Sequence, residues 1–241
     1  MGAQWKHAGR QANAAKRGAM ISKLAKEIQI AAKQGGADPG GNSRLRTALE
    51  AARRQSVPRD VIERAVKKGA GLLEGASYEL VTYEGFAPHK VPVIVECMTD
   101  NKNRTASDIR ILFRKGQLGS SGSVGYLFDR MGVIEAAHSD RSIDIEGAAI
   151  EAGAQNVEKM EDSVDENGKP QIGARFFTET TDLDAVNKAL IEAGWATSAA
   201  EMRYIPKSLI TLGDAESKDV IAFLEDIDDN DDVHRVYPAL A

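Results

Sequence analysis

Along the first third of the chain, apolar residues recur at the spacing of amphipathic helices. They lie three and four positions apart in three successive stretches, so each stretch predicts a helix with one buried face. The stretches are residues 16–34, 42–54 and 58–69. Three short amphipathic helices with short connections predict a small all-helical domain over residues 1–75, in which residues 1–15 form an arm before the first helix.

Residues at the ends of these stretches have the properties of helix caps. Asn42 can accept a backbone N–H at the start of the second helix. Pro58 suits the first turn of the third helix, where its missing N–H is not needed. Gly69 suits the end of that helix, because glycine adopts the left-handed conformation common there.

From residue 78 the period changes from 3.6 to 2, which predicts strands. The first part, residues 76–132, predicts strands at 78–84, 91–98 and 124–128, a helix at 105–115, a flexible Gly/Ser-rich connection at 116–122 and a turn at Gly132. A helix at 216–226 and a strand at 233–237 close the chain. A lone helix and strand bury too little to form a domain, so we expect them to return to the sheet that begins at residue 78.

Residues 133–205 alternate in the order β-α-β-β-α-β, which is the order of ferredoxin-like folds. Asn167-Gly168 indicates the hairpin between its second and third strands. The sequence therefore predicts an α+β protein of three domains. These are a helical domain at 1–75, a middle α+β domain at 76–132 plus 206–241, and an inserted ferredoxin-like domain at 133–205.

The charge is distributed unevenly between these parts. Residues 1–75 hold fifteen Lys and Arg against six Asp and Glu, a net charge of +9, whereas the remainder carries −14. A basic head on an acidic body points to a polyanionic partner. Lys16, Lys23, Lys26 and Lys33 lie off the apolar stripe of the first helix, and the arginines of the next two helices lie off theirs, so we expect the cations to face solvent.

These cations are the candidate nucleic-acid-binding residues, because exposed Lys and Arg suit contacts to phosphates. The candidates are Lys16, Arg17, Lys23, Arg44, Arg46, Arg53, Arg54, Arg59, Arg64, Lys67 and Lys68. Few aromatic residues alternate with them, so the pattern does not indicate stacking on single-stranded bases.

Composition restricts the class of protein further. An apolar fraction of 42% and a charged fraction of 28% are typical of a globular protein in water. No run reaches the roughly 18 apolar residues of a membrane span. The single Cys97 excludes an internal disulfide and fits a reducing compartment, so we expect a cytoplasmic protein that does not bind membranes. The sequence leaves the oligomeric state open.

No pattern in the sequence indicates catalysis, a cofactor or a metal. The four histidines are scattered, and the Gly116–Gly122 segment lacks the Gly-Lys-Ser/Thr ending of a phosphate-binding loop. The acidic segment, whose aspartates are Asp226, Asp228, Asp229, Asp231 and Asp232, departs from the calcium-binding loop pattern at its glycine and its final glutamate. We interpret it as an acidic rim on the middle domain.

Several segments together resemble one protein family over nearly the full length. They are Lys16-Arg-Gly, the Gly-Gly-x-Asp-Pro run from Gly35 to Arg46, Val57-Pro-Arg-Asp-Val-Ile-Glu-Arg-Ala-Val-Lys-Lys-Gly, Tyr83-Glu-Gly-Phe, Glu96-Cys-Met-Thr-Asp-Asn-Lys-Asn-Arg-Thr, Gly122-Ser-Val-Gly-Tyr-Leu-Phe and the end from Leu224 to Tyr237. The chain resembles the YebC-type family of probable transcriptional regulators, which includes the mitochondrial translational activator of cytochrome c oxidase subunit I. It departs from that family's pattern at Ala19, where a Lys normally follows Arg-Gly, and in a shorter basic arm.

The resemblance implies a helical N-terminal domain, a middle domain completed by the C-terminus, and a cytosolic nucleic-acid-binding regulator without catalytic residues. It leaves two targets open. The first is DNA, in a transcriptional role. The second is ribosomal RNA and the ribosome, in a translational role. A third and remote hypothesis from the residues is a metal-dependent phosphoryl hydrolase that uses the acidic segment at 226–232.

Overall fold

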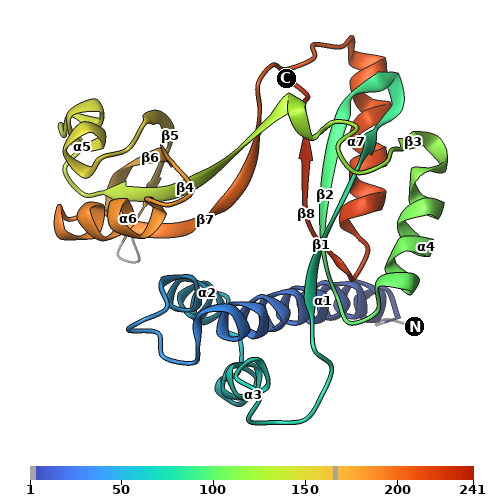
Figure 1. Ribbon diagram of the computed structural model, residues 1–241, viewed down its shortest axis with the longest axis horizontal. Coiled ribbons are helices and arrows are strands. Elements are labelled where there is room, and N and C mark those ends of the chain that lie inside the picture. The colour runs from blue at the N-terminus through green and yellow to red at the C-terminus, as the bar shows by residue number, and fades with distance from the viewer. Residues whose placement is uncertain (1–3, 165–167) are drawn as a thin grey trace. The chain divides into compact units, whose positions relative to one another are not determined.

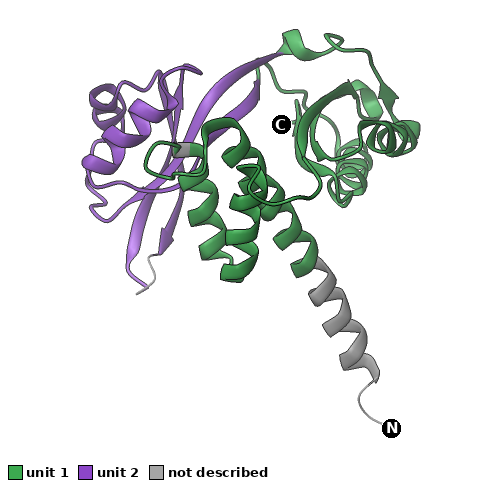
Figure 2. Cartoon of the chain, turned by 60° about the horizontal axis from the view of Figure 1, so that its bottom comes forward, with its two compact units in different colours: residues 1–127, 206–241 green, residues 128–205 purple. Residues whose placement is uncertain are grey.

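The computed structural model describes residues 4–164 and 168–241, and their side chains from residue 17 onward except at position 43. The chain forms two compact units, one of Met1–Leu127 with Pro206–Ala241 and one of Phe128–Ile205 (Figure 2). The first unit contains the helical head and the sheet that follows it. The division into three domains at the predicted boundaries stays a prediction.

The head consists of three helices, as the periodicity predicts (Figure 1). Their apolar stripes meet in one core, in which Ile28, Leu45 and Ala52 are fully buried. The predicted arm at 1–15 is wrong from residue 4 onward, since the first helix already begins there. That stretch is rich in Ala and Gln, which favour a helix even without an apolar stripe. The helices are α1 (Gln4–Gly35), α2 (Ser43–Arg54) and α3 (Arg59–Gly69).

Asn42 caps α2 as predicted and also joins that helix to α1. Its Oδ1 accepts the N–H of Leu45 at 3.0 Å. Its Nδ2 donates to the carbonyl oxygens of Ala31 and Gly36, each at 2.8 Å. One buried amide therefore satisfies backbone groups at the end of one helix and the start of the next.

Two other expectations at the helix ends need correction. Pro58 lies at the N-cap of α3, one residue before the first turn. Gly69 lies inside α3, and Ala70 is the C-cap. A Cβ atom at position 69 would approach the carbonyl oxygen of Gln29 to 2.4 Å. Gly69 therefore allows α3 to pack closely against α1 and does not end the helix.

The middle sheet of the first unit is completed by the C-terminus, as predicted. Its strand order is β3-β1-β2-β8, and β8 pairs antiparallel with β2. Two helices contribute to its core. Ile109 of α4 (Lys102–Leu112) and Phe223 of α7 (Asp214–Asp228) pack there with Val95 of β2. The elements are β1 (Glu79–Phe86), β2 (Pro92–Thr99), α4 (Lys102–Leu112), β3 (Gln117–Leu118), α7 (Asp214–Asp228) and β8 (Val233–Pro238), with 3-10 turns at Pro88–Lys90 and Phe113–Lys115.

The second unit has the predicted ferredoxin-like topology. Its strand order β5-β6-β4-β7 places the first and third strands at the centre. Trp195, Phe176 and Leu190 are the large side chains of its core. The Asn167 half of the predicted hairpin lies outside the described residues. The elements are β4 (Phe128–His138), α5 (Ile145–Ala152), β5 (Asn156–Val164), β6 (Pro170–Thr178), α6 (Leu183–Glu192) and β7 (Ala196–Pro206).

The junction before this unit differs from the prediction. Residues 125–127 form a 3-10 turn in place of the expected strand, and β4 runs straight through Gly132, where a turn is expected. Gly132 pairs with Thr178 on β6. A Cβ atom at position 132 would lie 2.2 Å from Thr178 Oγ1, so glycine allows these strands to approach closely.

Candidate nucleic-acid interface

The arginines of α2 lie outside its buried stripe, as predicted. Arg53 and Arg54 are exposed, whereas Arg44 and Arg46 are half-buried. Arg44 Nη1 donates to Gln34 Oε1 at 2.7 Å, and Arg46 Nη1 donates to the carbonyl oxygen of Pro39 at 3.4 Å. The last turn of α2 therefore presents two exposed guanidinium groups, while the first turn uses its arginines to hold the connection from α1.

The cations of α3 share their face with two acidic residues. Arg59 Nε lies 2.8 Å from Glu63 Oε1, and Arg64 Nη2 lies 3.9 Å from Asp60 Oδ2. Exposed pairs of this kind contribute at most about 1 kcal/mol, so either arginine can exchange its partner for a phosphate. Lys67 is exposed and lies two positions from the buried Ala65, on the opposite side of the helix. Lys68, the last of the α3 candidates, is half-buried.

The candidates on α1 have different surroundings. Arg17 is exposed, and the side chain of Lys16 lies outside the described residues. Lys23 points to the middle domain, where its Nζ donates to the carbonyl oxygen of Asp228 at 2.8 Å and lies 3.8 Å from Asp228 Oδ1. The structure thus brings Lys23 to the acidic segment.

Lys26, one turn further along α1, is buried, so the expectation that it faces solvent is wrong. Its Nζ donates to Asp232 Oδ1 at 2.9 Å and to the carbonyl oxygen of Asp231 at 2.8 Å. It also lies 5.3 Å from the centre of the Tyr78 ring, within the range of a cation–π contact. Lys26 therefore joins the head to the middle domain.

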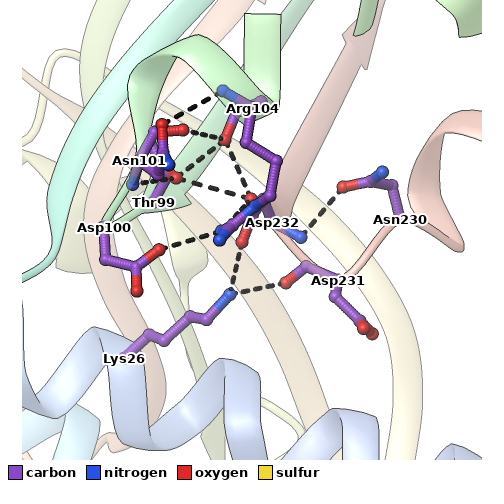
Figure 3. Close-up of polar contacts among 9 residues, drawn as sticks. Lys26, Thr99, Asp100, Asn101, Arg104, Asn230, Asp231 and Asp232 are labelled. Atoms are coloured by element: carbon purple, nitrogen blue, oxygen red, sulfur yellow. Dashed lines mark hydrogen bonds and ion pairs between the residues drawn. The ribbon is translucent and has the colours of Figure 1, made fainter. Parts of the chain in front are cut away.

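Asp232 is the centre of this network (Figure 3). Its Oδ2 accepts from Arg104 Nη2 and from Thr105 Oγ1, each at 2.8 Å, and from Thr99 Oγ1 at 3.4 Å. The interpretation of the acidic segment as an exposed rim is wrong at this position, because Asp232 is 7% exposed. The other four aspartates of the segment are exposed, as expected.

The environment of Asp232 keeps its carboxylate ionised. Burial alone would raise its pKa, but the hydrogen bonds from Arg104, Lys26 and Thr105 outweigh that effect and lower the pKa to about 2. A buried carboxylate with this many donors is satisfied as an anion. Asp232 is therefore a structural anion between α1, α4 and the middle sheet.

His234, two residues further on, is a half-buried group that the sequence did not single out. Burial, followed by the positive charges of Arg235, Arg44 and Lys23, lowers its pKa to about 3. Its Nε2 accepts from Arg235 Nε at 3.3 Å. The imidazole is therefore neutral near pH 7. The sequence around this histidine could not predict its environment, because two of the cations near it, Lys23 and Arg44, come from the distant helices α1 and α2.

Glu84 organises the Gly/Ser-rich segment, which the sequence predicted to be a flexible connection. Its Oε1 accepts the N–H of Gly122 at 2.8 Å, and its Oε2 accepts those of Val124 and Gly125 at 2.9 and 2.7 Å. Burial opposes ionisation, but these three N–H groups lower the pKa of Glu84 overall. The amide of Gly122 at the end of the segment and two amides just after it therefore bind an internal carboxylate.

Two features of the described residues, 4–164 and 168–241, are relevant to the hypotheses of a metal site and of a membrane span. Among them, no three His, Cys, Asp or Glu residues are grouped so that they could hold a metal ion. No helix in this part of the chain combines the length and the apolar character needed to cross a membrane. Cys97 is buried in β2, and burial raises the pKa of its thiol to about 12.

Two family models match the chain. One describes the N-terminal domain of TACO1/YebC proteins and matches residues 2–72, and the other describes their second and third domains and matches residues 78–240. A curated relative from Pseudomonas syringae pv. tomato is 53% identical over 243 residues, which cover 100% of both chains. One from Bdellovibrio bacteriovorus is 47% identical with the same coverage. Both are named as probable transcriptional regulatory proteins.

A solved structure agrees with this assignment. The chain is similar to a crystal structure of a conserved hypothetical protein from Aquifex aeolicus, with a TM-score of 0.81 and 38% sequence identity. The match covers 94% of this chain and 91% of the other. The family models, the full-length relatives and the common fold agree with one another, and the chain belongs to the TACO1/YebC family.

Proposed function

We propose that this protein is a non-enzymatic regulator of gene expression that binds DNA through the exposed cations of α2 and α3. The observation that carries the proposal is the set of cations on the outer faces of these helices, led by Arg53, Arg54 and Lys67, which lie away from the common core. The names of the full-length relatives, which are probable transcriptional regulatory proteins, support the role in regulation.

Electrostatics gives the proposed interaction its physical basis. Each phosphate that a Lys or Arg neutralises releases counterions, so binding weakens with salt by about 0.9 in the logarithmic slope per phosphate. Contacts by exposed helix faces to the phosphate backbone would bind many sequences similarly. In this proposal Arg17, Arg59 and Arg64 extend the binding face, while Lys23 holds the head to the middle domain.

Ribosomal RNA is the second candidate target. The acidic remainder of the chain, with a net charge of −14, favours it, because an acidic body can face basic ribosomal proteins while the head contacts RNA. The phosphoryl hydrolase hypothesis gains no support from the acidic segment. Its buried carboxylate, Asp232, is already occupied by donors from Lys26, Arg104 and Thr105.

A salt series of binding measurements tests the proposal. The double variant Arg53→Glu/Lys67→Glu reverses two exposed head cations, and Lys188→Glu/Lys218→Glu makes the same change in net charge on exposed sites outside the head. We expect the head variant to lose most of its affinity for duplex DNA and to show a salt slope smaller by about 2. The control variant should bind like the unmodified protein.

Two results would contradict the proposal that the head binds DNA. Equal losses in both double variants would mean that only net charge matters. Stronger binding to ribosomal RNA than to duplex DNA at matched salt, with the same sensitivity to Arg53→Glu/Lys67→Glu, would move the function to the ribosome.

A further inference from the structure

A groove on the middle domain is not part of the proposed nucleic-acid interface. It has a volume of about 340 Å³ and lies between α7 and β8. Ile221 and Leu224 of α7 and Val236 and Pro238 of β8 form its apolar walls. Ile221 is 47% exposed. Apolar side chains that gather along a groove, in contrast to scattered ones, mark a surface suited to a partner.

Acidic residues border this groove. Glu225, Asp228 and Asp229 line it together with the apolar walls, and all three are exposed. The whole of α7 carries six acidic residues and a single lysine. The negative border repels phosphates and favours a cationic partner.

The strand beside the groove is at the edge of its sheet. In the described part of the chain, β8 has β2 as its one neighbouring strand. An edge strand presents backbone N–H and C=O groups to which an extended peptide can add. The groove therefore combines apolar walls, a negative border and an adjacent strand edge.

We propose that this groove binds a basic, extended segment of a partner protein. Apolar side chains of the segment sit between α7 and β8, and its Lys and Arg residues pair with Glu225, Asp228 and Asp229. This protein-binding surface goes beyond the proposed binding of nucleic acid, which uses the head.

A model peptide and two matched variants test the proposal. The probe is a short, capped, fluorescently labelled peptide that alternates lysines with leucines, and its reference replaces the leucines by serines at the same charge. Ile221→Glu adds a negative charge inside the groove, whereas Ala222→Glu adds the same charge at the next, exposed position of α7, outside it. We expect Ile221→Glu to weaken binding of the leucine peptide about tenfold, or about 1.4 kcal/mol, and Ala222→Glu not to weaken it.

The test distinguishes the groove from simple attraction between charges, because the two predict opposite effects of Ile221→Glu on the affinity for the peptide. If charge alone attracts the peptide, both variants bind it more tightly, and the proposal is overturned. Equal affinity for the leucine and serine peptides, or no binding of either at low salt, overturns it as well. So does self-association in sedimentation velocity that Ile221→Glu abolishes, because a second copy would then fill the groove.

Thermal denaturation checks that both variants fold. Glu225→Lys provides an independent variant that leaves the apolar walls in place and reverses one charge of the border. This variant should bind the leucine peptide more weakly and bind duplex DNA as before. The two measurements therefore separate this proposal from the proposed function.

Discussion

The head carries two groups of cations that have the same charge and different surroundings. On α1, the side chain of Lys26 is 11% exposed and paired with Asp232, and Lys23 is bonded to Asp228. On α3, the side chain of Arg59 is 92% exposed, although it too lies near a carboxylate. Only the exposed group can exchange its partners for phosphates at small cost. The net charge of +9 therefore overstates what the head offers to a nucleic acid.

The largest effect should come from breaking the buried pair. Asp232→Ala leaves the ammonium of Lys26 in a buried site without its carboxylate, and removing one partner of a buried pair costs about 3–5 kcal/mol. We expect the free energy of unfolding of the first unit to fall by that amount. Hydrogen exchange of α1 and α4 measures it, and exchange of α5 and α6 in the second unit is the internal control. Unchanged protection of α1 would contradict the structural role of Asp232.

His234 should make the same region sensitive to acid. Its pKa is about 3 when folded, and an unperturbed histidine titrates near 6.5. Between these two pKa values the unfolded chain binds a proton that the folded chain does not. The free energy of unfolding therefore keeps its full value above about pH 6.5 and falls as the pH drops toward 3. At about pH 4.5 the loss is about 2–3 kcal/mol.

The variant His234→Gln removes this titration. Between about pH 6.5 and 4.5, we expect its urea midpoint to change much less with pH than that of the unmodified protein. Asp232 also makes the protein less stable in acid, but at lower pH. Its pKa is depressed to about 2, so its stabilising contribution disappears as the pH falls from about 4 toward 2. Identical pH profiles for the two proteins above pH 4.5 would show that His234 is not responsible.

Gly69→Ala tests the contact between α1 and α3. The added Cβ would lie 2.4 Å from the carbonyl oxygen of Gln29 and 2.8 Å from the Ala32 Cβ, so the helices must separate. Overpacking of this kind costs about 1–3 kcal/mol. Chemical denaturation monitored by circular dichroism measures the loss. Gly18→Ala, on an open part of α1, has no atom within 4 Å of the new Cβ and should be neutral or stabilising.

The smallest effect is expected at the exposed end of the contact between head and middle domain. Asp228→Ala leaves the hydrogen bond from Lys23 to the backbone oxygen of residue 228 in place and removes only a carboxylate 3.8 Å away. An exposed pair of this kind is worth less than about 1 kcal/mol. A loss in the urea midpoint comparable to that of Asp232→Ala would show that the two aspartates do not differ as described.

The sequence predicted most of the fold because local periodicity carries that information. The stripes of α2 and α3, the cap at Asn42 and the ferredoxin-like order all follow from spacing within a short stretch. The continuous strand through Gly132 did not follow from it. The need for glycine there comes from Thr178 on a neighbouring strand, and a local pattern cannot distinguish a glycine in a turn from one in a tight pair of strands.

The buried pair of Lys26 and Asp232 could not be predicted from the sequence, for a similar reason. Lys26 and Asp232 lie 206 positions apart. In their own segments, one is a lysine off the apolar stripe of a helix and the other is an aspartate among aspartates. Nothing local shows that this lysine and this aspartate form a buried pair. The outward cations of α2 and α3 were predictable, because each follows from the stripe of its own helix.

Salt dependence of DNA binding tests the difference between the two groups of cations most directly. Lys67→Gln and Lys23→Gln remove the same charge from the same head, one on the outer face of α3 and one against the middle domain. We expect Lys67→Gln to lower the logarithmic salt slope by about 1 and Lys23→Gln to leave it unchanged. Equal decreases in the two variants would contradict this expectation, because Lys23 would then also contact a phosphate.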